Sequence, residues 1–289
     1  MGAIVYNAPM LSTSKYIING SFSQQITPLD RGFAYGDGVF RTMMMRNGLP
    51  LQWPLHYQKL VADCAAIGIV CPSAELLMSD FQQLFTLDDI EEHRQGVAKI
   101  IITRGEGERG YKLPAIISPT RVVMKTAMPQ YASTAAKIGV TVHVCKTRLA
   151  HNVKLAGVKH LNRLENVLAR MEWSNDAIFD GLLLDDQDNV IECTMSNIFA
   201  RFDQKLMTPD LSQCGVAGVT RQRIIGLAPM LNLQVEVTSL PLKRLLIADE
   251  VLICNSLMGA FQVVEIENKT WKTQALAGNF RDLLLKQSL

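Results

Sequence analysis

The chain has 289 residues, of which 48% are hydrophobic and 19% charged, and its formal net charge is +2. This composition is typical of a globular protein with a substantial core, and it excludes a disordered chain. The charge is spread without a basic block and no apolar run is long enough to span a bilayer, so neither nucleic acid nor a membrane is an expected partner.

Two hairpins are predicted near the N-terminus, after an irregular polar lead-in over residues 1–15. Tyr16–Gly20 and Val39–Met45 are short apolar segments, and each leads into an Asn-Gly pair, at Asn19-Gly20 and at Asn47-Gly48. Asn-Gly favours the two-residue turn that joins antiparallel strands. The N-terminal part of the chain is therefore expected to contain antiparallel strands.

Two helices and two buried strands are predicted next. Apolar residues recur near helical spacing over Trp53–Ile67, and a second helix is expected over Ser73–Phe85. Val97–Thr103 and Arg121–Thr126 are short apolar runs, which indicate strands with both faces buried.

Residues 129–136 predict a linker, because they hold a proline and small polar residues without periodicity. The linker would separate a smaller N-terminal domain, residues 16–128, from a larger domain, residues 137–289. Mixed strands and helices on both sides indicate an α/β or α+β class. The elements expected in the larger domain are strands at Gly139–Val144, Leu182–Leu184, Ile198–Phe202 and Glu250–Cys254, and helices at Asn162–Trp173, Val219–Leu231 and from Gly278 onward.

The six cysteines are scattered, with no Cys-x-x-Cys pair and no histidine cluster beside them. This distribution argues against a structural zinc site, and no metal is expected. It favours free thiols in a reducing cytoplasm.

Lys159 is a candidate reactive amine, although a lone lysine is usually a solvated surface charge. It lies just before the helix predicted over Asn162–Trp173, whose apolar residues share one face that we expect to point inward. A partly desolvated lysine near a helix N-terminus has a lowered pKa, because both effects disfavour the ammonium form. The neutral amine can attack an aldehyde and can act as a general base.

Glu192 is a candidate partner for a protonated ring nitrogen. It follows a turn over Asp185–Asn189 and a short strand, Val190–Ile191. An exposed carboxylate at a sheet edge is the simpler interpretation. The functional one requires a buried and paired carboxylate, since an unpaired buried charge is costly. A reactive lysine and such a carboxylate are the two groups that pyridoxal phosphate requires of its protein.

A phosphate site is predicted where the glycine-bearing loop Gly215–Arg221 enters a helix. Backbone N–H groups at a helix start bind anions, and the Thr220 hydroxyl could assist. Asn255 and Ser256 offer further polar groups at a strand end, and Lys59 would supply a cation.

The segment Thr103–Tyr111 is rich in glycine and contains Arg104 and Arg109. It lacks the Gly-Lys-Ser/Thr ending of a phosphate loop, so a solvated turn is the default interpretation. Arginine beside an active site is also suited to a bidentate grip on a substrate carboxylate.

Five segments in this order resemble the fold-type IV, or class IV aminotransferase, family of pyridoxal-phosphate enzymes. That family includes branched-chain and D-amino-acid aminotransferases and aminodeoxychorismate lyases. The segments are Tyr35–Thr42, Thr103–Tyr111, Gly157–Glu165, Glu192–Phe199 and Ala248–Met258. Thr42, the Lys-His-Leu-Asn-Arg-Leu-Glu string from Lys159 and the Cys-Asn-x-Leu-Met string from Cys254 are most similar to the lyase branch.

The resemblance implies that Lys159 is the Schiff-base lysine for pyridoxal 5′-phosphate and that Glu192 pairs with the ring nitrogen. It implies phosphate contacts from Val219, Thr220 and Ser256, a place near the cofactor for Thr42, and substrate contacts from Arg109 and Tyr111. Lys59 is a departure, because the family usually has arginine there. Lysine keeps the charge and loses the bidentate geometry. Arg41 is a second departure without an explanation from the sequence.

The resemblance also implies a smaller N-terminal α/β domain, a larger C-terminal domain with a barrel-like sheet, and a homodimer. The implied reaction converts 4-amino-4-deoxychorismate to 4-aminobenzoate and pyruvate, a step of folate biosynthesis. One alternative is a D-amino-acid or branched-chain aminotransferase that uses the same Lys159 and Glu192. The other is a homologue that binds the cofactor without catalysis.

Overall fold

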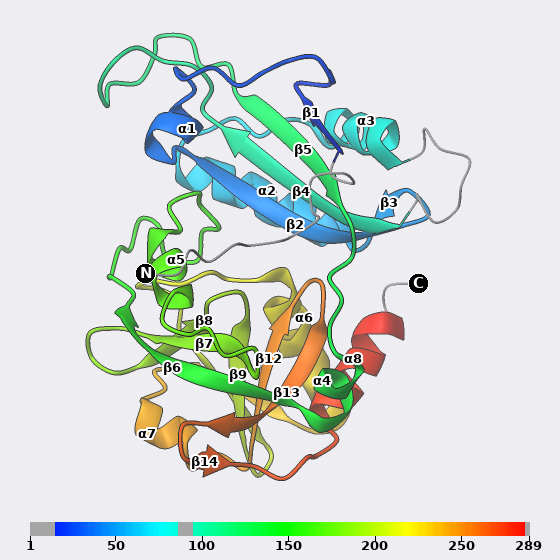
Figure 1. The fold of residues 1–289 in the computed structure, drawn as a ribbon, viewed down its shortest axis with the longest axis vertical. Coiled ribbons are helices and arrows are strands. Elements are labelled where there is room, and N and C mark those ends of the chain that lie inside the picture. Colours follow the sequence, from blue (N-terminus) through cyan, green and yellow to red (C-terminus); the bar gives the residue numbers. More distant parts are fainter. Residues whose placement is uncertain (1–14, 86–94, 287–289) are drawn as a thin grey trace.

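The computed structural model of the protein describes residues 15–85 and 95–286, which form two β-sheets flanked by helices (Figure 1). The lead-in predicted over residues 1–15 falls outside the described residues, except Lys15, which begins the first strand. The N-terminal sheet lies above the C-terminal sheet in the view of Figure 1. The mixed α/β class expected from the sequence is confirmed.

The N-terminal sheet has five antiparallel strands in the order β1-β5-β4-β2-β3. Both predicted Asn-Gly turns form, with positive φ at Asn19 (51°), Gly20 (83°), Asn47 (51°) and Gly48 (78°). The second joins the paired strands β2 and β3, as predicted, whereas the strand hairpin predicted at the first is wrong, because β1 pairs with β5. The strands are β1 (Lys15–Ile18), β2 (Gly38–Arg46), β3 (Leu49–Pro50), β4 (Gly96–Thr103) and β5 (Thr120–Thr126).

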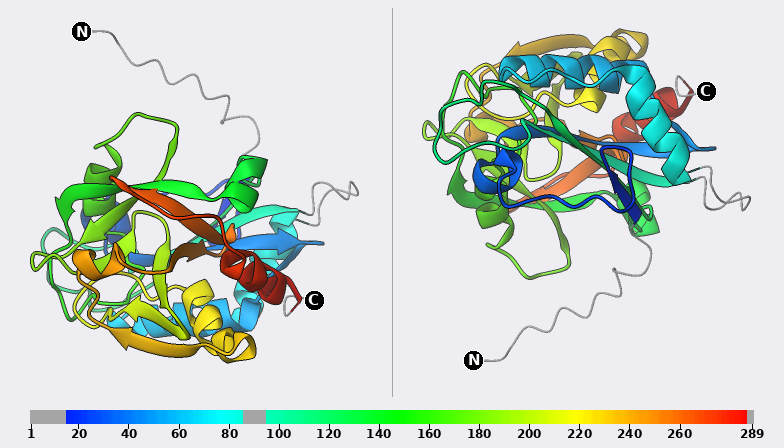
Figure 2. Two further views of the ribbon diagram at one scale, coloured as in Figure 1. Left: turned by 90° about the horizontal axis from the view of Figure 1, so that it is seen from below. Right: turned by 90° about the horizontal axis from the view of Figure 1, so that it is seen from above.

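Two helices cover one face of this sheet, α2 (Trp53–Ala66) and α3 (Ala74–Phe85) (Figure 2). Their apolar residues, among them Leu60 and Phe81, share one core with Ile100 of β4. Both helices were predicted. A short helix that the sequence did not predict, α1 (Arg31–Tyr35), begins at Asp30, whose carboxylate accepts hydrogen bonds from the first-turn N–H groups.

The C-terminal sheet has nine mixed strands and curls around its own core (Figure 2). Its order is β11-β10-β9-β12-β13-β6-β7-β8, with β14 paired to β13. The strands are β6 (Val140–Arg148), β7 (Ile178–Leu184), β8 (Val190–Cys193), β9 (Asn197–Phe202), β10 (Lys205–Pro209), β11 (Gln234–Thr238), β12 (Glu250–Asn255), β13 (Gly259–Ile266) and β14 (Lys269–Thr270).

Two helices, α6 (Val219–Leu227) and α8 (Leu276–Lys286), pack on this sheet and close a second core around Phe199 and Phe280. A 3-10 turn, Ala228–Leu231, extends α6 to the end of the predicted helix. A further helix, α7 (Leu242–Leu245), is a single turn that the sequence did not predict.

The division of the chain at residues 129–136 stays a prediction. Within that segment the structure differs from a plain linker, because a short helix, α4 (Ser133–Ile138), forms before β6. In Figure 1 the chain passes from β5 to α4 along one side of the molecule.

The helix predicted over Asn162–Trp173 is shorter than expected, α5 (Leu164–Arg170), and its apolar face does not point inward. Leu164 is 68% exposed, and the other apolar residues of that face, Val167, Leu168 and Met171, are exposed as well. The expectation of a buried face is therefore wrong for this chain. Across the described residues, no helix combines the length and hydropathy needed to cross a bilayer.

Candidate active site

A cavity of about 390 Å³ lies where the two sheets face each other. Its size is within the usual range for a small-molecule site. Seven of the residues predicted to act in the site line it, namely Thr42, Lys159, Glu192, Val219, Thr220, Asn255 and Ser256. Elements from both halves of the chain therefore converge on one site.

Lys159 is held at the edge of the N-terminal sheet by its own backbone. Its carbonyl accepts a hydrogen bond from the Phe40 N–H at 2.9 Å, and the Leu161 N–H donates to the Gly38 carbonyl at 2.9 Å. The Lys159 Nζ atom lies 4.5 Å from the centroid of the Phe40 ring. The amine is thus directed into the cavity beside an aromatic face.

The pKa of Lys159 is lowered to about 8, chiefly because burial disfavours the ammonium form. The positive charges of Arg41, Arg163 and Lys99 lower it further, whereas Glu192 opposes the shift. The neutral amine, which a nucleophile requires, is therefore far more populated near physiological pH than in an ordinary lysine.

Glu192 lies on β8, the last strand in the sheet order, but it is only 4% exposed, so it is not the exposed carboxylate of the simpler interpretation. Its Oε2 atom accepts a hydrogen bond from the Val216 N–H at 2.9 Å. Burial raises the pKa of Glu192 to about 7, while the Val216 bond, Arg163 and Lys159 lower it. A protonated ring nitrogen in the cavity would supply the positive partner that this buried carboxylate calls for.

A second buried acid shapes the cavity wall. Asp180 on β7 accepts hydrogen bonds from Thr194 Oγ1 at 2.6 Å and Ser196 Oγ at 2.7 Å. Both hydroxyl residues belong to the loop between β8 and β9, which lines the cavity. Asp180 thereby fixes the loop that follows Glu192.

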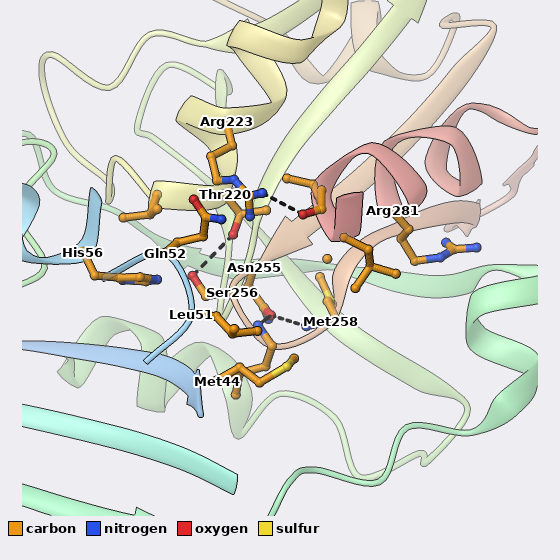
Figure 3. A pocket seen from close by; sticks show the side chains of 15 residues that line it. Met44, Leu51, Gln52, His56, Thr220, Arg223, Asn255, Ser256, Met258 and Arg281 are labelled. Carbon is orange, nitrogen blue, oxygen red and sulfur yellow. Dashed lines mark hydrogen bonds between the residues drawn. The ribbon is translucent and has the colours of Figure 1, made fainter. Parts of the chain in front are cut away.

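The residues predicted to bind phosphate meet at the start of α6. Thr220 Oγ1 and Ser256 Oγ are 3.3 Å apart, and both border a hollow that adjoins the cavity (Figure 3). The N-cap of α6 is Gly218, without a side-chain cap, so its first N–H groups are available to an anion. A Cβ atom on Gly218 would lie 2.3 Å from Asn197 Oδ1, which explains the glycine.

His56 is a site residue that the sequence analysis missed. It reaches from α2 to the hollow that Thr220 and Ser256 border (Figure 3). Among the described residues its Nδ1 atom has no hydrogen-bond partner. Burial, with Arg41 and Arg223, lowers the pKa of His56 to about 3, so the ring is neutral. No local pattern around position 56 distinguishes this histidine from a core residue.

The sequence analysis also gave no individual role to the lining residues Phe40, Tyr131, Arg163 and Asn166. Arg163 donates to the carbonyl groups of Val158 and His160, so it braces the backbone on both sides of Lys159. Its place four residues after Lys159 is a feature that could have identified it.

Three predicted residues are not among those that line the cavity in the described chain. Lys59 donates to Asp63 and, at 2.9 Å, to the Gly157 carbonyl. Tyr111 is 84% exposed and packs on Tyr35 at 5.4 Å between ring centroids, and Arg109 lies on the same exposed loop. Their roles stay predictions.

Arg104, the other arginine of that glycine-rich segment, is structural. Its Nε and Nη2 atoms donate to the two oxygens of Asp37 at 2.7 and 2.9 Å. It also donates to the carbonyl groups of Ile67 and Gly68, which close α2. Arg104 therefore joins the end of α2 to the N-terminal sheet.

The donor set of the cavity fits pyridoxal 5′-phosphate. A lysine with a lowered pKa can condense with the aldehyde, and a buried carboxylate can hold the ring nitrogen protonated. The α6 N-terminus with Thr220 and Ser256 can receive the phosphate. These groups occupy different walls of one cavity of suitable volume.

Comparison with known proteins agrees with this arrangement. Residues 38–266 match the family model described as amino-transferase class IV. The chain is 36% identical to an aminodeoxychorismate lyase of Vibrio harveyi, over 87% of this chain and 92% of that protein. It is 29% identical to a putative branched-chain-amino-acid aminotransferase of Methanocaldococcus jannaschii, over 94% and 97% respectively.

A crystal structure of 4-amino-4-deoxychorismate lyase from Pseudomonas aeruginosa superimposes with a TM-score of 0.88 at 37% identity. The match covers 94% of this chain and 98% of that one. The Escherichia coli branched-chain amino acid aminotransferase shares the fold, with a TM-score of 0.81 at 19% identity, over 95% of this chain and 94% of that one.

Proposed function

The chain belongs to the class IV amino-transferase family, and we propose that within this family it is a 4-amino-4-deoxychorismate lyase that uses pyridoxal 5′-phosphate. The observation that carries the proposal is the cavity in which Lys159 and Glu192 lie with the Thr220–Ser256 pair. The similarity to lyases at 36% and 37% identity, over nearly the whole length, supports this branch of the family. The product 4-aminobenzoate would place the reaction in folate biosynthesis.

Lys159 and Glu192 would hold the cofactor at its aldehyde and its ring nitrogen, and the start of α6 with Thr220, Asn255 and Ser256 would hold its phosphate. Bound pyridoxal phosphate supplies an electron sink for the pair of electrons left when the substrate carbon loses its proton. The negative charge of Glu192 keeps a proton on the ring nitrogen, which deepens that sink.

Lys159 would move the proton. With its pKa lowered to about 8, the amine can take the proton from the substrate carbon that bears the amino group. It can then return this proton to the departing enolpyruvate, which becomes pyruvate. The substrate ring becomes aromatic, so the atoms balance without a second substrate. Thr42, beside Lys159 on the cavity wall, is placed to assist this transfer.

Arg109 and Tyr111 are proposed to contact the substrate's carboxylates. They lie on an exposed loop away from the cavity of their own chain. In a homodimer such a loop can reach the site of the partner subunit.

A homodimer is supported by a groove with an apolar lining between α1 and α5. Exposed side chains that include Phe33, Leu164 and Val167 border it. Adjoining exposed apolar side chains of this kind can mark a protein–protein contact. A second copy of the chain would bury it.

A reducing cytoplasm is supported by the cysteines. All six are free thiols, and five of them, Cys64, Cys145, Cys193, Cys214 and Cys254, are buried.

Chromatography of the products tests the proposed reaction. Purified protein loaded with pyridoxal phosphate and supplied with 4-amino-4-deoxychorismate alone is expected to release 4-aminobenzoate and pyruvate in equal amounts. Turnover that needs an amino donor together with a keto acid would instead identify an aminotransferase. A protein that binds the cofactor and converts neither set of substrates would be the inactive homologue.

A further inference from the structure

Arg41 and Lys59, the two departures from the family pattern, meet in the structure at one buried carboxylate. Asp63 on α2 is 1% exposed and accepts hydrogen bonds from Arg41 Nη2 and Lys59 Nζ. Its Oδ2 atom also accepts the Lys159 backbone N–H at 3.3 Å. The two unusual cations are therefore parts of one cluster beneath the reactive lysine.

The cluster carries more positive than negative charge. Arg41 and Lys59 bring two positive charges and Asp63 brings one negative charge. Burial lowers the pKa of Arg41 to about 10 and that of Lys59 to about 8, so Arg41 is charged and Lys59 is mostly charged at pH 7. An excess charge in a buried region is costly unless an anion compensates it. The cavity beside the cluster is where such an anion can enter.

The two cations differ in what they face. Lys59 is committed to Asp63 and to the Gly157 carbonyl, and it is not among the described residues that line the cavity. Arg41 lines the cavity, is 3% exposed, and its Nε atom has no hydrogen-bond partner among the described residues. Arg41 therefore retains a buried donor for a ligand.

Arg41 lines the same cavity as the residues assigned to the phosphate. His56, which feels the positive charges of both Arg41 and Arg223, lines the cavity together with Thr220 and Ser256. Arg41, His56 and the Thr220–Ser256 pair therefore line one cavity. A phosphate held at the start of α6 would share this cavity with the unpaired Nε donor of Arg41.

We propose that Arg41, positioned by Asp63, is the cation that binds the phosphate of pyridoxal 5′-phosphate in this protein, and that Lys59 serves to fix Asp63. The inference rests on the proposed function, since it presumes this cofactor. In this assignment the phosphate is bound by the planar guanidinium of Arg41 rather than by the point charge of Lys59, and a guanidinium suits a phosphate better. It also accounts for the arginine that the sequence left unexplained.

A matched pair of variants tests the proposal. Arg41→Met and Lys59→Met each remove one cation and leave Asp63 paired with the other. The dissociation constants of the cofactor-free proteins for pyridoxal 5′-phosphate and for pyridoxal, which lacks the phosphate, are measured by absorbance titration. We expect Arg41→Met to weaken pyridoxal phosphate binding by about 10- to 100-fold and to leave pyridoxal binding unchanged. Lys59→Met should weaken it by less than about 3-fold.

Two results would overturn the proposal. One is a loss of pyridoxal phosphate affinity in Lys59→Met that equals or exceeds the loss in Arg41→Met. The other is an unchanged affinity in Arg41→Met with a raised KM for substrate, which would assign Arg41 to a substrate carboxylate. If the unaltered protein binds no pyridoxal phosphate at all, the proposed function fails instead.

Inorganic phosphate gives a second measurement, which does not depend on the aldehyde chemistry. It should raise the thermal unfolding midpoint of the cofactor-free protein and of Lys59→Met, because a ligand that binds the folded state stabilises it. Arg41→Lys, which keeps the charge and loses the planar fork, should show a smaller shift. A full shift in Arg41→Lys and Arg41→Met alike would contradict the assignment.

Discussion

At the scale of single residues, the lowered pKa of Lys159 gives a pH dependence for cofactor binding. With a pKa of about 8, about a quarter of the amine is neutral at pH 7.5, whereas an ordinary lysine is neutral in about one molecule in a thousand. The rate at which cofactor-free protein captures pyridoxal phosphate should rise up to about pH 8 and then level off. Stopped-flow absorbance measures this rate, with Nα-acetyl-lysine as the reference amine. A rate that still climbs tenfold per pH unit above pH 9 would contradict the shift.

Glu192 gives a second residue-scale prediction. Glutamine at this position can still accept the Val216 N–H, but it lacks the charge that holds a proton on the ring nitrogen. Glu192→Gln should lower kcat by about 10²- to 10⁴-fold while the protein still binds cofactor. Steady-state kinetics measure the loss. Glu250→Gln is the control, since Glu250 is a buried acid of β12 outside the cavity lining and should retain activity. Equal losses in both variants would indicate a structural effect.

The sequence identified the residues whose chemistry is visible in a local segment. Lys159, Glu192 and Thr220 each lie in a segment with a characteristic pattern, and all three line the cavity. Asp63 and His56 could not be predicted in this way. Each of them acts through partners on other elements, and their local sequence is that of an ordinary amphipathic helix.

At the scale of elements, the start of α6 can be tested with its two glycines. Gly218→Ala would place a Cβ atom 2.3 Å from Asn197 Oδ1, so the helix start must shift. We expect a roughly 10-fold or greater loss of pyridoxal phosphate affinity, because the first N–H groups of α6 would move away from the phosphate.

Gly226→Ala in the same helix is the matched control. No atom lies within 4 Å of a Cβ at this position, and alanine favours a helix over glycine by about 1 kcal/mol. Gly226→Ala should therefore raise the free energy of unfolding in urea and leave cofactor affinity unchanged. A cofactor affinity of Gly218→Ala that equals that of Gly226→Ala would exclude α6 from phosphate binding.

Elements were predictable where their own residues determine them. The Asn-Gly turns, α2 and α3 follow from turn chemistry and helical spacing, and all are present. The short helix α1 depends on a single cap, Asp30, which leaves little pattern. For α5 the sequence correctly indicated one apolar face, but periodicity does not say whether that face meets the core or another molecule.

At the scale of the whole molecule, the exposed apolar groove predicts a dimer, and one charged side chain introduced into the groove should weaken it. Phe33 on α1 is among its lining residues, and Phe33→Glu should raise the dimer dissociation constant by at least about 10-fold, because a charge would be buried without a partner. Analytical ultracentrifugation over a range of concentrations measures it. Val70→Glu is the control, since Val70 is equally exposed and lies outside the groove. Dissociation in both variants alike would place the interface elsewhere.

The mixed α/β class could be inferred from the sequence, whereas the way in which the two sheets face each other could not. Strand and helix patterns are local, but the cavity depends on which edges of two sheets face each other. Thr42 of β2 and Val219 of α6 line the same cavity although 177 positions separate them in the chain.

Within three residues, the segment that carries Lys159 is hydrogen-bonded to both halves of the chain. Gly157 donates to the Gly215 carbonyl and accepts from the Ala217 N–H in the C-terminal half, and the Lys159 carbonyl accepts from the Phe40 N–H of β2. Lys159 therefore lies on a segment that is hydrogen-bonded both to β2 and to the loop before α6. A ligand bound to both Lys159 and Glu192 would connect the two sheets. Cofactor binding should therefore make the two sheets unfold as one cooperative unit and protect the segment near residue 130 from proteases.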